Sequence, residues 1–419
     1  MLPDVDWTQR MGRLRSVISA RRAFGSGLLL VLIGVLYARN EGLSMRGAVP
    51  QQRIAAGTDV AKLLELTANG VARTWIADHR ASKLPFRWGQ GVLMLGLDCT
   101  AQHTRDAGAA AAIDAYVRSY YESHDKRTTT FTWSDEVTPA IAAATRLARG
   151  ERARQRVVDE AVHYVMHAPR TSVRGVITHF GRSPLRYLAP PFPDAWVDSL
   201  FHVVPLLIRH AQITNAAREL DEAAEQVVRF MRVVQDPKTG LVTHAFSERD
   251  GTVAPEPAID AQAFWLRGQA WVLASGVEAW AALPEQHPLR TELGDRLVRL
   301  ERAVTARQAP SGLFHTLVTR TDSYEETAGS ALVVYALSRG VTAKLFDVPA
   351  QQAAARGMRG LLAIIEHDGE RYEVTGTSLG TNPWPAIYAY VPTASQVSYG
   401  VGAWLLAACE QHPQPKLSN

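Results

Sequence analysis

The stretch Leu266–Trp280, LRGQAWVLASGVEAW, decides the fold class of this 419-residue chain. Apart from Arg267 and Glu278 it is uncharged, and it is rich in Gly, Ala and Trp. A helix that is apolar on every side has to be buried on every side. A chain that contains such a helix therefore needs other helices to cover it.

Amphipathic segments alternate with segments of this nearly apolar kind. Apolar residues at helical spacing, with charges on the opposite face, occur in DEAAEQVVRFMRVV (221–234), TELGDRLVRLERAVTARQ (291–308) and VPAQQAAARGMRGLLAIIEH (348–367). Further nearly apolar stretches are WGQGVLMLGL (88–97), WVDSLFHVVPLL (196–207), TAGSALVVYALSRGV (327–341) and YGVGAWLLAACE (399–410). The alternation predicts two concentric layers of helices, with room for a short hairpin in a loop.

Weak internal repeats extend this prediction to a ring. GVITHF (175–180), GLVTHAF (240–246) and GLFHT (312–316) each follow an amphipathic segment and precede an apolar one. Roughly 360 residues at about 60 per hairpin give an all-α (α/α)6 barrel, a toroid of six helical hairpins. In a closed ring the first and last inner helices are neighbours, which brings Cys99 and Cys409 to similar depth. Contact between them is open, but two buried thiols are the preferred interpretation.

Composition excludes several classes of protein. Hydrophobic content of 47% and charged content of 21% are typical of a globular chain. The net charge is +4, and no basic tract carries interleaved aromatic residues, so we expect no nucleic-acid partner. Two cysteines are too few for a disulfide scaffold or a multi-cysteine zinc site, so we expect no metal and no cofactor.

The N-terminal part of the chain predicts a membrane anchor. Arginines precede the apolar run FGSGLLLVLIGVLYA (24–38), which is short for a span of about 20 residues. We interpret residues 1–23 as cytoplasmic, 24–38 as an uncleaved signal anchor and the rest as extracytoplasmic, periplasmic or at the cell surface. A cleaved signal peptide and a buried helix remain alternatives. A linker (39–56), the barrel (57–412) and a tail (413–419) follow.

Polar and aromatic side chains gather in the loops that lead into the apolar helices, where a site is expected. The candidates are Arg87, Trp88, Trp133, Asp135, His179, Trp196, Asp198, His244, Trp265, Arg267, Trp271, Tyr324 and Glu326. Indoles can stack on a sugar ring, and an arginine can pair with a carboxylate. This set therefore suits an acidic oligosaccharide.

Each candidate also has a structural explanation. Asp198 and Asp135 could cap helices, although Phe201 replaces the Glu or Gln of a capping box after Asp198. His179 and His244 could be structural loop residues. Trp265 and Trp271 could be core residues. Arg267 is harder to explain in this way, because an unpaired arginine is costly to bury.

The motifs WVDSLFHVVPLL, WLRGQAW, YEETAGSALVVYALSRG and SYGVGAWLLA resemble those of the unsaturated glucuronyl and rhamnogalacturonyl hydrolases, glycoside hydrolase families 88 and 105. The resemblance runs in order from residue 87 to the last helix. It implies the (α/α)6 barrel and hydration of the double bond of a 4,5-unsaturated uronic acid at the non-reducing end of an oligosaccharide.

The resemblance also implies roles for single residues. Asp198 matches the general acid and base, whose pKa we expect an aromatic pocket to raise. Asp135 matches a second aspartate that tunes the site. His179 and His244 match histidines that contact sugar or water. The substrate-binding set is completed by Trp88, Trp133, Trp196, Trp265, Arg267 and Trp271.

Some positions depart from the family pattern. Val391, Gln396, Val397 and Tyr399 stand where Arg, Asn, Asp and His are common, and Gln269 stands where Asn is common. These changes leave two alternatives open. One is a barrel hydrolase or lyase that acts on a saturated sugar. The other is a catalytically silent carbohydrate-binding or scaffold protein of polysaccharide assembly.

Overall fold

A computed structural model describes residues 47–51, 54–55, 57–125, 130–185, 193–249, 252–255 and 263–411. The predicted cytoplasmic segment 1–23, the signal anchor 24–38 and the tail 413–419 lie outside these ranges. Within the described ranges, every helix is too short or too polar to cross a membrane. The domain boundaries assigned from the sequence stay predictions.

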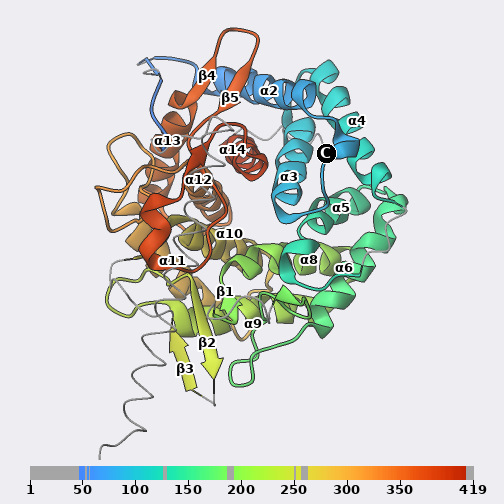
Figure 1. The fold of residues 1–419 in the computed structure, drawn as a ribbon, viewed down its shortest axis with the longest axis vertical. Coiled ribbons are helices and arrows are strands. Elements are labelled where there is room, and N and C mark those ends of the chain that lie inside the picture. The colour runs from blue at the N-terminus through green and yellow to red at the C-terminus, as the bar shows by residue number, and fades with distance from the viewer. Residues whose placement is uncertain are drawn as a thin grey trace, which may run out of the picture.

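Twelve α-helices of the described chain form two layers around a common centre (Figure 1). The inner helices are α3 (Trp88–His103), α5 (Pro139–Ala148), α8 (Asp198–Thr214), α10 (Leu266–Ala282), α12 (Thr327–Thr342) and α14 (Ser398–Gln411). The outer helices are α2 (Val60–Asp78), α4 (Ala107–Ser123), α6 (Gln155–His167), α9 (Ala217–Val234), α11 (Arg290–Thr305) and α13 (Val348–Ala363). Each inner helix contacts the next, and α14 contacts α3, which closes the ring. The predicted toroid of six hairpins is confirmed.

Burial explains the two layers. Helix α10 is buried without a break from Leu266 to Ala279, as its apolar sequence requires. Helix α9 buries one face, which includes Val227, Phe230 and Met231, and leaves its charged face outside. The predicted alternation of apolar and amphipathic helices is therefore an alternation of inner and outer positions.

Short strands depart from the all-α prediction. The connections between helices contain β1 (Ala195–Trp196), β2 (Ala245–Arg249), β3 (Thr252–Pro255), β4 (Ile365–His367), β5 (Tyr372–Val374), β6 (Thr377–Ser378) and β7 (Thr393–Ala394). They form one three-stranded and two two-stranded antiparallel sheets. Three of the four pairs form within one connection: β2 with β3 between α9 and α10, and β4 with β5 and β6 with β7 between α13 and α14. The pairing of β1 with β2 matters most, since it joins the loops that precede α8 and α10.

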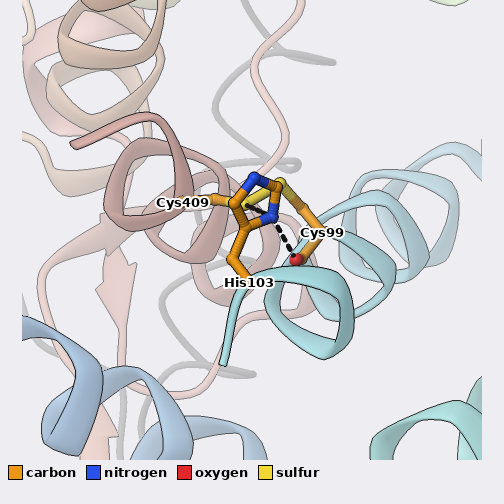
Figure 2. Close-up of side chains that lie close together, drawn as sticks. All are labelled: Cys99, His103 and Cys409. Atoms are coloured by element: carbon orange, nitrogen blue, oxygen red, sulfur yellow. Dashed lines mark hydrogen bonds between the residues drawn. A yellow bond between two sulfur atoms is a disulfide. The ribbon is translucent and has the colours of Figure 1, made fainter. Parts of the chain in front are cut away.

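The ring closes where α3 and α14 approach most closely. A Cβ atom on Gly96 would lie 2.4 Å from the carbonyl oxygen of Gly402, so only glycine fits this contact. Farther along the same two helices, Cys99 and Cys409 form a disulfide, with 6.2 Å between their Cα atoms (Figure 2). His103 lies beside it, with Nδ1 donating to the Cys99 carbonyl at 2.9 Å. The preferred interpretation of two separate thiols was wrong, because close helix packing brings the two side chains within bonding reach.

Paired charges occupy the second halves of the inner helices. One member of this group lies on each inner helix: Asp98, Arg146, Arg209, Glu278, Arg339 and Glu410. They form ion pairs: Arg146–Asp98 at 2.8 Å, Arg209–Glu278 at 2.6 Å and Arg339–Glu410 at 2.7 Å. Burial would raise the pKa of Glu278, but Arg209 and Arg339 lower it, so this acid stays charged.

Candidate active site

The opposite end of the ring, where the inner helices begin, holds the candidate active site. Asp198 is the first residue of α8, and the β1–β2 pairing places Ala245 opposite Trp196. This register brings His244 beside Asp198, with His244 Nε2 2.9 Å from Asp198 Oδ2. Two residues that lie 46 positions apart are thus in hydrogen-bond contact.

The helix-cap explanation of the two aspartates does not hold. Val197 occupies the N-cap position of α8, and Asp198 makes no capping hydrogen bond. Asp135 lies in the 3-10 helix η2 (Ser134–Val137), which precedes α5, and Thr138 occupies the N-cap of α5. Both carboxylates therefore face side chains of the site.

The imidazole of His244, which contacts Asp198, is itself held by other side chains. It also contacts Tyr388, with 2.8 Å between His244 Nδ1 and the tyrosine oxygen. Tyr388 belongs to the 3-10 helix η4 (Pro385–Tyr390) and is fully buried. Trp265 stacks on the His244 ring at 4.2 Å between ring centres. The imidazole is therefore fixed on three sides.

The expected rise in the pKa of Asp198 is not found in this ligand-free structure. Burial of the carboxyl would raise its pKa, but His244, together with His179 and His202, outweighs burial and lowers the pKa. The aromatic neighbours visible in the sequence supply the burial. The imidazoles that reverse the direction include His244, which comes from a distant loop.

Two histidines face the second aspartate. His202 Nε2 lies 3.1 Å and His179 Nε2 lies 3.6 Å from Asp135 Oδ1. That oxygen is buried and has no hydrogen-bond partner among the described residues. His179 stacks on Trp196 at 3.9 Å, and its Nδ1 contacts Ser199 Oγ at 3.2 Å. Burial lowers the pKa of His179, which favours a neutral ring despite the nearby Asp135.

The remaining predicted tryptophans lie around these groups. Trp133 stacks on Phe180, with 5.9 Å between ring centres. Trp88 contacts Tyr399 at 4.4 Å and lies 6.4 Å from Trp271. The buried Trp271 Nε1 has no hydrogen-bond partner in the described part of the chain.

Arg267 is engaged by protein groups. Its guanidinium is buried and donates to the carbonyls of Ser378 (2.8 Å) and Leu379 (2.9 Å) and to Thr381 Oγ1 (3.1 Å). Glu326 lies 3.6 Å away and also accepts from the backbone of α12. In this structure Arg267 therefore fixes the 378–381 loop, and its role as a substrate ligand stays a prediction.

A cavity of about 580 Å³ opens beside Asp135. Its lining includes Arg87, Trp88, Trp133, Asp135, Glu136 and Ser183. Arg87 is exposed; its backbone carbonyl accepts from Gly91 at 2.9 Å, and its guanidinium makes no hydrogen bond or ion pair with any described residue. Aromatic faces, carboxylates and one unpaired guanidinium on a cavity wall are suited to an acidic sugar.

The residues that depart from the family pattern are built into the fold. The Tyr399 hydroxyl donates to the Ser378 carbonyl, and Gln396 Oε1 accepts from the Val374 backbone at 3.0 Å. The Val391 carbonyl accepts from the Tyr324 hydroxyl at 2.8 Å. Val397 packs against the core as a partly buried residue. Tyr399 stands closest to the site, against Trp88.

His202 and Tyr388 were not among the predicted site residues. The signal for His202 was available, since it follows Asp198 by four positions and so lies on the same helix face. Tyr388 had no such signal, because its position depends on the path of a long connection. Among the described residues, the group that could hold a metal ion is Cys99, His103 and Cys409, whose sulfurs are joined as a disulfide.

Comparisons with known proteins agree with this geometry. Unsaturated rhamnogalacturonyl hydrolase YesR from Bacillus subtilis is 26% identical over 223 residues, which is 53% of this chain and 59% of that protein. A possible member of the GH105 family from Salmonella enterica has a TM-score of 0.69 at 21% identity, over 86% of this chain and 96% of that one. Unsaturated glucuronyl hydrolase from Bacillus sp. GL1 has a TM-score of 0.66 at 16% identity, over 83% and 95%.

The family profile described as Glycosyl Hydrolase Family 88 matches residues 67–414, which span both helical layers and all of the candidate site. A match of this extent, together with the six-hairpin ring and the two aspartates, identifies the chain as a member of glycoside hydrolase family 88.

Proposed function

We propose that this protein releases a 4,5-unsaturated uronic acid from the non-reducing end of an oligosaccharide by hydrating its double bond. The observation that carries the proposal is the pair of carboxylates, Asp198 and Asp135, each facing an imidazole at the start of the inner helices. The neighbouring cavity supplies aromatic faces and a guanidinium. Family membership and the named activities of the relatives support the same reaction.

Asp198 acts as the acid and then as the base in this proposal. It transfers a proton to C4 of the double bond, which leaves positive charge at C5 beside the ring oxygen. Water adds at C5 and returns its proton to Asp198. The resulting hemiketal opens, and the glycosidic bond to the rest of the oligosaccharide breaks. In this proposal the carboxyl group of Asp135 lies near the positive charge at C5 and stabilises it.

The lowered pKa of Asp198 has to be reversed before this first step. The substrate carries its own carboxylate, and a like charge brought near Asp198 raises the pKa of the aspartate. The proton comes from the Asp198–His244 pair, which binds it between Oδ2 and Nε2. Substrate binding thus moves the proton toward the group that delivers it.

A substrate screen tests the proposal. Oligosaccharides from lyase-digested pectin and glycosaminoglycans are incubated with the protein, and loss of ultraviolet absorbance reports the double bond. Wild type is expected to remove the absorbance, and Asp198→Asn is the inactive control. Activity on saturated oligosaccharides alone would favour the alternative barrel hydrolase, and sugar binding without turnover would favour a binding protein.

We also propose that the barrel works outside the cytoplasm, held by a single-pass anchor. The arginine-rich segment before residues 24–38 and the Cys99–Cys409 disulfide support this location, because disulfides persist mainly in oxidising compartments. Protease treatment of intact cells or spheroplasts, followed by detection of the barrel, checks the prediction. Protection of the barrel until the cells are lysed would contradict it.

A further inference from the structure

His202 is a buried imidazole on α8, one helical turn beyond Asp198, and only 2% of its surface is exposed. Its Nε2 lies 3.1 Å from Asp135 Oδ1, and its Nδ1 lies 2.8 Å from Thr138 Oγ1. Leu200, Val203 and Val204 surround it in sequence, so a polar ring here is an exception on an apolar helix. Burial of such a group is costly unless its nitrogens find partners.

The same arrangement occurs around both aspartates. His244 lies between the Tyr388 hydroxyl and Asp198, at 2.8 Å and 2.9 Å. His202 lies between the Thr138 hydroxyl and Asp135, at 2.8 Å and 3.1 Å. In each case the second nitrogen contacts a hydroxyl, which fixes the orientation of the ring. Each carboxylate therefore has an imidazole of its own.

His202 is the closer of the two imidazoles that face Asp135. Asp135 Oδ1 is buried and has no hydrogen bond within the described ranges, so ion-pair contacts alone face it. The second imidazole, His179, is farther away at 3.6 Å, and burial lowers its pKa and favours the neutral ring. A buried carboxylate without a cationic partner would be costly.

Packing alone does not account for His202. Its ring lies 6.3 Å from Trp88 and 6.1 Å from Trp271, in contacts that an apolar side chain would also make. An apolar residue would leave Asp135 Oδ1 without its closest partner. The titratable groups near His202 include Asp135, His179 and Asp198, all of which belong to the candidate site.

We propose that His202 is a positioning residue for the second aspartate: it holds Asp135 as a carboxylate beside the cavity and keeps it from competing with Asp198 for the proton. The two acids then have different tasks because each faces a different imidazole. The catalytic meaning of this proposal rests on the proposed function. The state of the Asp135 carboxyl group does not, and it can be measured without turnover.

Kinetics of two substitutions test the catalytic part. His202→Leu removes the contact with Asp135, and we expect kcat to fall about tenfold to a hundredfold, as for loss of a polar contact with a charged group, with KM nearly unchanged. His202→Gln keeps an N–H donor at similar reach and is expected to recover part of the rate. The matched control is His210→Gln, on the same helix, whose ring pairs with Glu219 away from the site. It should keep the wild-type rate and pH profile.

A spectroscopic measurement tests the structural part. The carboxyl carbon of Asp135, assigned by comparison with Asp135→Asn, is followed by 13C NMR in mildly acidic buffer. We expect the resonance of a carboxylate in wild type and a shift toward that of the acid in His202→Leu. An unchanged resonance would overturn the proposal, whether or not the protein turns over substrate. If His202→Leu does not fold, the same measurements are made on His202→Gln. An unchanged pH–rate profile together with an unchanged Asp135 resonance in that variant would also overturn the proposal.

Discussion

Buried polar and charged side chains are paired differently at the two ends of the inner helices. Where the helices end, Arg146 contacts Asp98, Asp114 and Glu151 within 2.8 Å, and Glu278 has both Arg209 and the Tyr335 hydroxyl within 2.6 Å. Where the helices begin, Asp135 Oδ1 and Trp271 Nε1 have no hydrogen-bond partner among the described residues.

This difference indicates that one end of the inner helices contributes mainly to stability, and that the other end carries the groups of the proposed reaction. At the helix ends, each buried charge is neutralised by a neighbour, and removal of one partner would leave an uncompensated charge. At the helix starts, polar groups are left with capacity for a ligand. A substitution at one end should therefore change unfolding, and a substitution at the other end should change turnover.

Asp198→Asn should give the largest effect, and it should appear mainly in turnover. Loss of the proton donor is expected to slow hydration of the unsaturated uronyl group at least about a hundredfold. The asparagine amide can still contact His244, but the stabilising negative charge is lost, so the thermal midpoint should fall slightly. Ultraviolet kinetics and thermal unfolding of the same samples check both. A near-wild-type rate would remove Asp198 from the mechanism.

Arg146→Met tests the opposite end. The side chain of Arg146 is fully buried, and its removal leaves Asp98, Asp114 and Glu151 without their shared cation. We expect a loss of about 3–5 kcal/mol in the free energy of unfolding, as for other broken buried ion pairs. Denaturant unfolding gives the value. The double variant Arg146→Met with Asp98→Asn should recover part of the lost free energy of unfolding. Both variants are expected to keep the wild-type activity per folded molecule.

Replacement of both cysteines by serine should have a smaller effect. The disulfide joins residues separated by 310 positions, and such cross-links typically stabilise a fold by about 2–4 kcal/mol. The contact between α3 and α14 at Gly96 and Gly402 remains in the double variant. Denaturant unfolding of oxidised wild type, reduced wild type and the double variant measures the effect. Loss of activity in the folded double variant would contradict the separation of the two ends.

The pH profile should show the smallest and most specific effect. Because the pKa of Asp198 is lowered in the free protein, the protonated fraction grows as pH falls, so kcat/KM should rise toward acidic pH. The bound uronate raises the pKa, so the falling limb of kcat should lie at higher pH than that of kcat/KM. Coincident limbs would mean that the substrate carboxylate does not reach Asp198.

The same lowered pKa affects stability. The folded pKa of Asp198 lies below the unfolded value of about 3.9, so its ionised form contributes stability above that pH. This contribution is lost as pH falls through the folded pKa. Acid therefore favours the protonated catalyst and weakens the fold at once, which sets the lower limit of the useful pH range.

The fold could be predicted from the sequence because the hydrophobic pattern of each single helix indicates whether it lies in the inner or the outer layer. The apolar run at Leu266–Trp280 and the amphipathic run at 221–234 each determine one kind of helix without knowledge of the rest. The disulfide was harder to predict, since it depends on how closely α3 and α14 pack. That distance is set by Gly96 and Gly402, whose effect is visible only when the helices are placed together.

The sequence indicated which side chains lie close together, and it indicated their electrostatics less well. Asp198, Asp135, His179 and His244 converge at one end of the ring, as the motifs indicated. The direction of the pKa shift was wrong because Trp196 and Phe201 are neighbours of Asp198 in sequence, whereas His244 reaches it only through the β1–β2 pairing. The hydrogen-bond partners of Arg267 lie more than a hundred residues away and could not be predicted from its own helix.

The seam between α3 and α14 has a consequence for how the protein is made. Tyr388, which orients His244, and Tyr399, which supports Trp88, both come from the last stretch of the described chain. An emerging polypeptide carries Asp135 and Asp198 long before those tyrosines exist. We therefore expect a chain truncated before these tyrosines to lack a complete site, because the two aromatic supports are added only when the final helix docks against the first.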